Sequence, residues 1–185
     1  IFDAQGQLVA NAPHIPVHLG AMGETVRDLL THVPHPAAGQ AWLTNDPWAG
    51  WSHLPDLTVI TAVDGGGERP WFVASRANHV DVGGKTPGSM PPHSRSLEEE
   101  GAVLRRIPLV QEGVFVMPQA LAHHSREPGV VQADLEAQVA ANAFAARQLV
   151  ALGDGPGAEA GMAAPHVRGV GPPPRAPAGS SPGGT

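Results

Sequence analysis

Cysteine is absent from all 185 residues of the sequence. This absence excludes a disulfide scaffold, a thiolate zinc site and a cysteine nucleophile. Any metal site must therefore be built from the 10 histidines and the carboxylates. A chain without cysteine also fits the cytoplasm, which is the location we expect.

Basic runs and long apolar runs are missing as well. Lys and Arg number 11 against 17 Asp and Glu, which gives a net charge of −6, so we expect neither a nucleic acid nor an anionic membrane surface as partner. No apolar stretch approaches the roughly 18 residues that a membrane-spanning helix needs. The chain begins at Ile1 without a methionine or a basic leader, and we expect a soluble chain that starts inside a domain.

Glycine and proline are abundant, and their distribution marks a boundary. Residues 154–185 hold 8 Gly and 7 Pro, so 15 of 32 positions disfavour regular structure. Such a segment cannot bury enough apolar surface to offset its loss of conformational entropy. The sequence therefore predicts one domain over residues 1–153 and a disordered tail over residues 154–185.

The pattern of apolar residues within the predicted domain indicates both helices and strands. We expect helices over residues 20–31 and 133–152, a short helix capped by Ser96, and strands over residues 41–44, 57–63, 70–75, 103–110 and 114–117. The strand over residues 57–63 has two apolar faces, which indicates burial on both sides. Together these elements predict an α+β fold of antiparallel hairpins with flanking helices, as a fragment of a larger domain.

Two polar segments flank the central predicted hairpin. His53 and Asp56 precede its first strand, and His79 and Asp81 follow its second strand. Because antiparallel pairing places the start of one strand beside the end of the next, we expect both pairs at one end of the sheet. Two imidazoles and two carboxylates without a thiolate suit one Zn²⁺, Mn²⁺ or Fe²⁺ ion. A structural hydrogen-bond network of the same residues is the alternative, and the sequence leaves both open.

Three other motifs have weaker interpretations. Residues 83–86 read Gly-Gly-Lys-Thr, like the end of a phosphate-binding loop, but His79 stands where the first glycine of such a loop belongs, so we expect no ATP binding there. His123 and His124 lie in a proline-flanked segment that we interpret as a solvated loop. The acidic run of residues 98–100 is either a solvated helix face or a source of acid and base groups.

A series of motifs then resembles one family in its order along the chain. The motifs are His14-Ile-Pro-Val-His18-Leu-Gly, Asn45-Asp46-Pro47, His53-Leu-Pro-Asp56, Ala74-Ser-Arg76, His79-x-Asp81-x-Gly83-Gly84, Thr86-Pro-Gly-Ser-Met-Pro-Pro92 and Glu99-Glu100-Gly101. Residues 1–153 thereby resemble the hydantoinase B/oxoprolinase family, and are most similar to the B-type, C-terminal half of ATP-dependent 5-oxoprolinases. The tail takes no part in this resemblance.

The resemblance implies a hydrolase that opens cyclic amides, converting 5-oxo-L-proline to L-glutamate within glutathione metabolism. It implies an A-type subunit or domain as partner, which binds ATP, and a divalent transition metal in the B-type half. It implies His53, Asp56, His79 and Asp81 as metal ligands, with Asp46 and Asn78 as further candidates. The candidates for contacting the small cyclic amide are Arg76, Gly83, Gly84 and Ser89.

Some features depart from the family pattern. Family members often have His-His where this chain has Asn78-His79, so one ligand is either missing or replaced by an amide oxygen. The resemblance also starts after the N-terminal part of the B-type domain, which is thought to supply a further carboxylate. The sequence leaves two alternatives open. The chain is either a subunit of a related hydantoinase or ketone carboxylase, or a non-catalytic remnant.

Overall fold

The computed structural model describes residues 1–12, 17–50, 53–88 and 91–153, and the predicted disordered tail lies outside these residues. In this part of the chain the elements are α1 (Val17–His32), β1 (Ala41–Thr44), β2 (Asp56–Val63), β3 (Trp71–Asn78), α2 (Leu97–Glu100), β4 (Ile107–Gln111), β5 (Val114–Phe115), α3 (Gln119–His124) and α4 (Pro128–Gly153). None of the described helices is long and apolar enough to cross a lipid bilayer.

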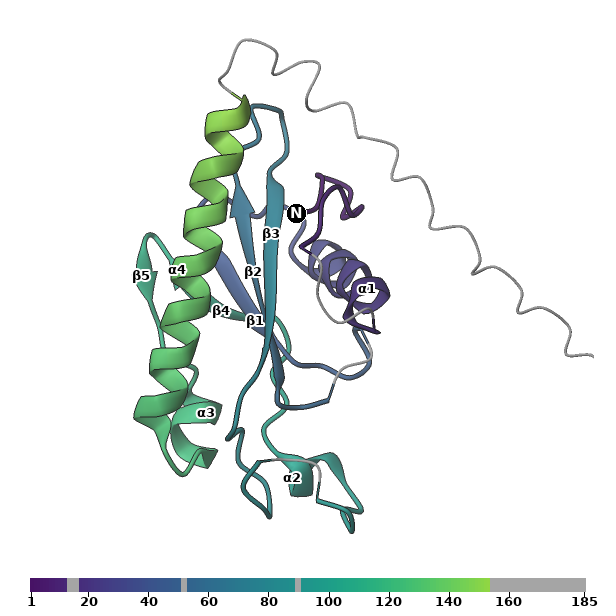
Figure 1. Cartoon of the computed structure of the whole chain (residues 1–185), viewed down its shortest axis with the longest axis vertical. Coiled ribbons are helices and arrows are strands. Elements are labelled where there is room, and N and C mark those ends of the chain that lie inside the picture. Colours follow the sequence, from purple (N-terminus) through teal and green to yellow (C-terminus); the bar gives the residue numbers. More distant parts are fainter. Residues whose placement is uncertain (13–16, 51–52, 89–90, 154–185) are drawn as a thin grey trace, which may run out of the picture.

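The strands form one antiparallel sheet in the order β3-β2-β1-β4-β5. Helix α1 covers one face of this sheet and helix α4 covers the other (Figure 1). Strand β2 lies inside the sheet with both faces covered, and all of its residues are buried, as its two apolar faces predict. The expected α+β fold of antiparallel hairpins with flanking helices is confirmed.

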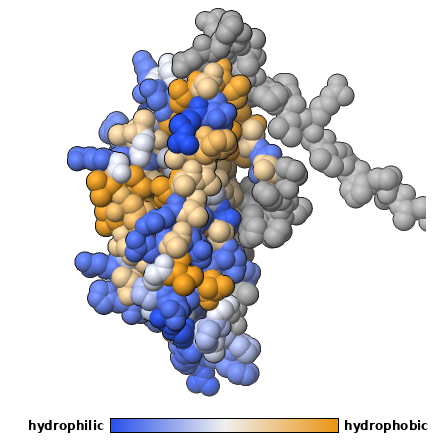
Figure 2. Space-filling model, turned by 60° about the vertical axis from the view of Figure 1, so that its left-hand side comes forward, coloured by the Kyte–Doolittle hydropathy of each residue, from blue (hydrophilic) through white to orange (hydrophobic). Residues whose placement is uncertain are grey.

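Each face of the sheet has its own apolar core. The core under α1 is formed mainly by Phe2, Val26, Leu29, Trp42, Ile60 and Phe72. The core under α3 and α4 is formed mainly by Leu43, Leu57, Val59, Leu109, Leu121 and Leu135. Apolar side chains also remain on the surface near β5 and along α4, where Val114, Val116 and Phe144 are exposed (Figure 2).

The first residues of the chain pack against β3 rather than forming a separate unit. Phe2 and Phe72 exchange both main-chain hydrogen bonds, at 2.8 Å and 2.9 Å, in antiparallel orientation. On its other side this segment pairs with residues 7–10, because Asp3 donates to the carbonyl of Gln7 and Val9 donates to that of Ile1. Residues 1–3 therefore lie beside the outer edge of β3 and bridge to it at Phe2.

Several boundaries differ from the sequence prediction. Helix α4 begins at Pro128 instead of residue 133, since proline fits the first turn of a helix. Strand β4 begins at Ile107 instead of residue 103, because Asn45 holds the preceding segment as a loop by accepting the Leu104 N–H at 2.6 Å, and Arg106 has a φ of 53°. Ser96 precedes α2 but makes no capping hydrogen bond.

The interpretation of His123 and His124 as a loop is wrong. Both residues lie in the last turn of α3. Their Nδ1 atoms donate to the carbonyls of Gln119 and Ala120, four residues earlier, at 2.7 Å each. These side chains are exposed, as predicted, and each bonds back to the preceding turn of its own helix.

Candidate functional site

The hairpin of β2 and β3 brings Asp56 and Asn78 together. Asp56 is the first residue of β2 and pairs directly with Asn78, the last residue of β3. Paired residues place their side chains on the same face of a sheet, and the Asn78 amide donates to Asp56 Oδ1 at 2.8 Å. The main-chain N–H of His53 donates to Asp56 Oδ2 at 3.3 Å. The Asp56 carboxylate is thus buried and held by neutral donors.

Arg76 lies on the same face of β3, two residues before Asn78. Its Nε donates to Thr58 Oγ1 at 2.7 Å, and one terminal nitrogen donates to Thr25 Oγ1 of α1 at 3.1 Å. The other terminal nitrogen, Nη1, is buried without a partner among the described residues. Burial lowers the pKa of Arg76, and the negative charge of Asp56 opposes this shift. The side chain is therefore a fixed cation with one donor that no described residue uses.

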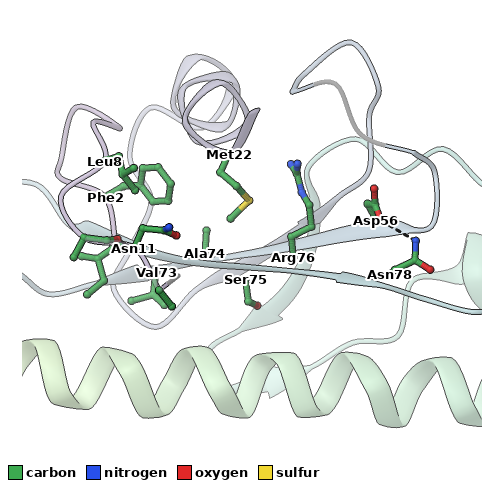
Figure 3. A pocket seen from close by; sticks show the side chains of 13 residues that line it. Phe2, Leu8, Asn11, Met22, Asp56, Val73, Ala74, Ser75, Arg76 and Asn78 are labelled. Carbon is green, nitrogen blue, oxygen red and sulfur yellow. Dashed lines mark hydrogen bonds between the residues drawn. The ribbon is translucent and has the colours of Figure 1, made fainter. Parts of the chain in front are cut away.

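These polar groups line one end of a cavity of about 690 Å³ between α1, the first residues and β3. Figure 3 shows Arg76, Asp56 and Asn78 at one end of this cavity, with Phe2 and Leu8 at the other. The walls are mostly apolar, apart from these three side chains and Asn11. The Ser75 side chain points to the other face of the sheet, where its Oγ accepts from Gln138. Such a combination suits a small ligand that has both an apolar body and an oxygen-bearing end.

His79 is at the same end of the sheet but points to the other face. Its side chain is 2% exposed, and Nε2 lies 2.8 Å from Oε1 of Gln138 on α4. Its Nδ1 is buried without a partner in the described part of the chain. Because successive residues of a strand alternate between faces, position 78 and not position 79 shares a face with Asp56. The structure does not bring His79 to Asp56.

Asp81 fastens the loop after β3 to the start of α4. It accepts hydrogen bonds from the main-chain N–H groups of Gly83, Arg126 and Glu127, and the Arg126 guanidinium lies 3.1 Å from its Oδ1. Burial raises its pKa, but the three N–H groups and the charge of Arg126 outweigh burial and hold the pKa below 3.8. Both oxygens of the Asp81 carboxylate are therefore occupied by hydrogen bonds within the chain.

Asp46 is likewise engaged away from Asp56. Its Oδ1 accepts the Trp48 N–H at 3.2 Å, and its Oδ2 lies 3.0 Å from Nε of Arg105. Among the described residues, no three His, Asp or Glu side chains come close enough to hold a metal ion together. The predicted pairs thus share one end of the sheet, while their side chains diverge.

Backbone conformation and close packing explain why glycine stands at positions 83 and 84, the two glycines predicted to contact the substrate. Gly83 and Gly84 have φ of 85° and 83°, in the left-handed region. A Cβ on Gly84 would lie 2.5 Å from the Glu100 carbonyl oxygen, and one on Gly83 would lie 2.8 Å from the His124 side chain. Neither glycine lines the cavity beside Asp56. Ser89 lies outside the described residues.

Sequence reasoning assigned no role to three buried residues that support this site. Thr25 orients Arg76 from α1, and Gln138 contacts His79 from α4. Asn45 donates to the carbonyls of Leu54 and Ala102 at 2.7 Å and 2.8 Å, and so fixes the loop that carries His53. One signal was present in the sequence: Gln138 is a polar residue among the apolar positions of its helix, and a buried polar side chain needs a hydrogen-bond partner.

Comparisons with known proteins agree on one family. A family model described as hydantoinase B/oxoprolinase matches residues 1–165, past the boundary predicted at Gly153. A 5-oxoprolinase of Arabidopsis thaliana is 46% identical, and one of Dictyostelium discoideum is 47% identical. Each alignment covers 77% of this chain but only 12% of the relative, so the chain spans about an eighth of their length.

A solved structure shares the fold. The ATP-dependent caprolactamase of Pseudomonas jessenii superposes with a TM-score of 0.70 and 25% sequence identity. The superposition covers 76% of this chain and 25% of the caprolactamase chain. The sheet and its flanking helices are therefore part of a larger architecture in that enzyme.

Proposed function

The chain belongs to the hydantoinase B/oxoprolinase family, and we propose that it forms part of the hydrolytic, B-type half of an enzyme that opens cyclic amides. The proposed reaction is the conversion of 5-oxo-L-proline to L-glutamate, driven by ATP that an A-type half binds. Two relatives at 46% and 47% identity bear the name 5-oxoprolinase, which supports this substrate. A place in glutathione metabolism in the cytoplasm belongs to the same proposal.

The observation that carries the proposal is the position of Asp56 and Arg76 in the apolar cavity. Arg76 has one donor without a partner in the described part of the chain, so it can donate to an oxygen of the substrate. A fixed guanidinium in a site shielded from water stabilises negative charge on such an oxygen more strongly than it does in water. The apolar walls formed by residues such as Phe2 and Met22 suit the methylene groups of a small ring.

We further propose that His53 and Asp56 are ligands of a divalent transition metal. The described residues alone do not fit a metal site, because they place only one carboxylate, one amide and the His53 loop together. Further donors would therefore come from other parts of the family domain. We assign no step of the reaction to the metal. His79 and Asp81 are left out of this proposal because their side chains have partners elsewhere.

A segment exchange tests the proposed function. Residues 1–153 would replace the matching segment of the Arabidopsis thaliana relative, which retains the remaining parts of the enzyme. We expect ATP-dependent formation of glutamate from 5-oxoproline by the exchanged protein. A folded exchanged protein that forms no glutamate, beside an unmodified relative that does, would contradict the proposal.

A further inference from the structure

Among the described residues, only Phe2 pairs through its main chain with the outer edge of β3. In an antiparallel pair, a residue that exchanges hydrogen bonds with one neighbour points both its N–H and its C=O to that side. Phe72 exchanges both bonds with Phe2, so its main-chain groups point away from β2. By alternation, the main-chain groups of Ala74 and Arg76 also point to the outer edge. No described residue bonds to them there.

The Phe2–Phe72 pair fixes how a strand would continue along this edge. Residues 1–3 run antiparallel to β3, so polypeptide joined before Ile1 would run toward Arg76 and Asn78. The first residue before Ile1 would pair with Ala74, and the third would pair with Arg76. Their side chains would enter the cavity that contains Asp56, since Phe2 and its partner Phe72 lie on that face.

We propose that the free edge of β3 binds the extended segment that directly precedes the matched region in longer members of the family. The chain spans only 12% of its curated relatives and 25% of the caprolactamase chain, so most of the family architecture lies in other segments. Strand β3 has eight residues and one charged side chain, and beyond Phe72 no described residue pairs with its outer edge. Native proteins normally cover such an edge. The other open edge, β5, has only two residues and offers no comparable surface.

The proposed strand would complete the wall of the cavity beside the Asp56 end of the sheet. Its side chain opposite Arg76 would stand next to the guanidinium whose Nη1 has no partner among the described residues. This strand pairing does not depend on which substrate the enzyme uses, and therefore stands apart from the proposed function.

The test uses the chain with and without an N-terminal extension. The extension consists of the residues that precede the matched segment in the Arabidopsis thaliana relative, long enough to reach Asn78. We expect hydrogen exchange at the Ala74 and Arg76 amides to slow by roughly tenfold or more, as for other hydrogen-bonded strand amides. A Gly-Ser extension of equal length is the control, and with it both amides should exchange as fast as in the unextended chain.

A proline substitution separates edge pairing from general stabilisation. Ala74→Pro removes an N–H that faces the open edge, so β2–β3 pairing persists while the benefit of the extension is lost. Ala77→Pro removes an N–H that faces β2 and should unfold the hairpin with or without the extension. If Ala74→Pro fails to fold, the proposal is tested by amide exchange alone, in the unsubstituted chain with and without the extension.

Two results would overturn the proposal. One is equal exchange at Ala74 and Arg76 with and without the extension. The other is slow exchange in the unextended chain together with dimers in sedimentation, which would assign the edge to a second copy of the chain.

Discussion

At the scale of single residues, the partner of Asp56 decides what its end of the sheet can bind. Asn78 occupies the paired position and offers one amide where an imidazole would offer a stronger ligand for a transition metal. His79 offers its imidazole to the opposite face. Moving the imidazole by one residue therefore changes the face on which it acts.

In the exchanged protein, which retains the other parts of the family domain, Asn78→His should raise the affinity for Zn²⁺, because the new imidazole would share a face with Asp56. Asp56→Ala and His53→Ala should each lower that affinity by at least the roughly 10–100-fold that the loss of a residue supporting a ligand costs. His123→Ala is the control, since this exposed residue in the last turn of α3 donates to a carbonyl of its own helix. Elemental analysis and metal titration measure the effect. Equal metal content in all of these proteins would contradict the assignment.

Asp81 should make the stability of the chain depend on pH in the acid range. Its folded-state pKa lies below the ordinary 3.8, so the stabilisation is fully present above that value and is lost as the pH falls through the lower, folded-state pKa. Asp81→Asn should reduce the free energy of unfolding at neutral pH by about 1–3 kcal/mol, because one acceptor oxygen becomes an NH2 donor facing N–H groups and the charge opposite Arg126 is lost. Urea unfolding measured across this pH range provides the test.

The matched control for Asp81 is the exposed Asp134 on α4. Asp134→Asn should leave both the stability and its dependence on pH nearly unchanged. If the two variants have the same free energy of unfolding at each pH, Asp81 does not stabilise the junction between the loop after β3 and α4.

Part of this site could be predicted from residue types and spacing. Antiparallel pairing of the predicted hairpin placed His53, Asp56, His79 and Asp81 at one end of it, and the structure places them there. The sequence could not show which side chains converge, because that depends on the register of the pairing to a single residue. Nor could it show Arg126, which is distant in sequence, as the partner of Asp81.

At the scale of elements, helix α4 is joined to the sheet by polar as well as apolar contacts. Asn142 donates to the Val59 carbonyl at 3.0 Å and to Thr61 Oγ1 at 3.2 Å, and it is 2% exposed. Gln138, one turn earlier, reaches the Leu57 carbonyl at 3.3 Å. These amides fix the position of α4 along β2, which apolar contacts alone would leave free to shift.

Asn142→Leu should therefore lower the free energy of unfolding by about 1–3 kcal/mol, although leucine is the more apolar residue. Gln148→Leu is the control, because Gln148 is an exposed amide on the same helix. Chemical denaturation of both variants measures the difference. A stable Asn142→Leu protein would show that the buried amide contributes little.

The elements themselves were predicted unevenly. The hairpin of β2 and β3 was predicted well because a strongly apolar strand, a glycine-rich turn and a second strand follow one another locally. Helix α3 was missed because six residues between prolines carry too little periodicity to indicate a helix. The start of β4 was missed because Asn45, distant in sequence, holds the preceding residues.

At the scale of the whole molecule, the chain should not bind ATP by itself. Lys85, the only lysine of the chain, lies 2.6 Å from the Glu99 carboxylate, and Gly84 is packed against the Glu100 main chain, so this loop presents no phosphate cradle. Calorimetry with Mg-ATP should give no saturable heat at micromolar concentrations. Saturable binding would contradict the division of the reaction between an A-type and a B-type half.

The central claim is that the Asp56 end of the hairpin takes part in opening the cyclic amide. Its most direct test measures ATP-dependent glutamate formation by the exchanged Arabidopsis thaliana protein carrying Asp56→Asn. We predict a loss of roughly 100-fold or more in kcat/KM with an unchanged melting temperature. The same protein with Asp64→Asn, in the exposed turn after β2, should keep its activity. Full activity of the folded Asp56→Asn protein would contradict the account.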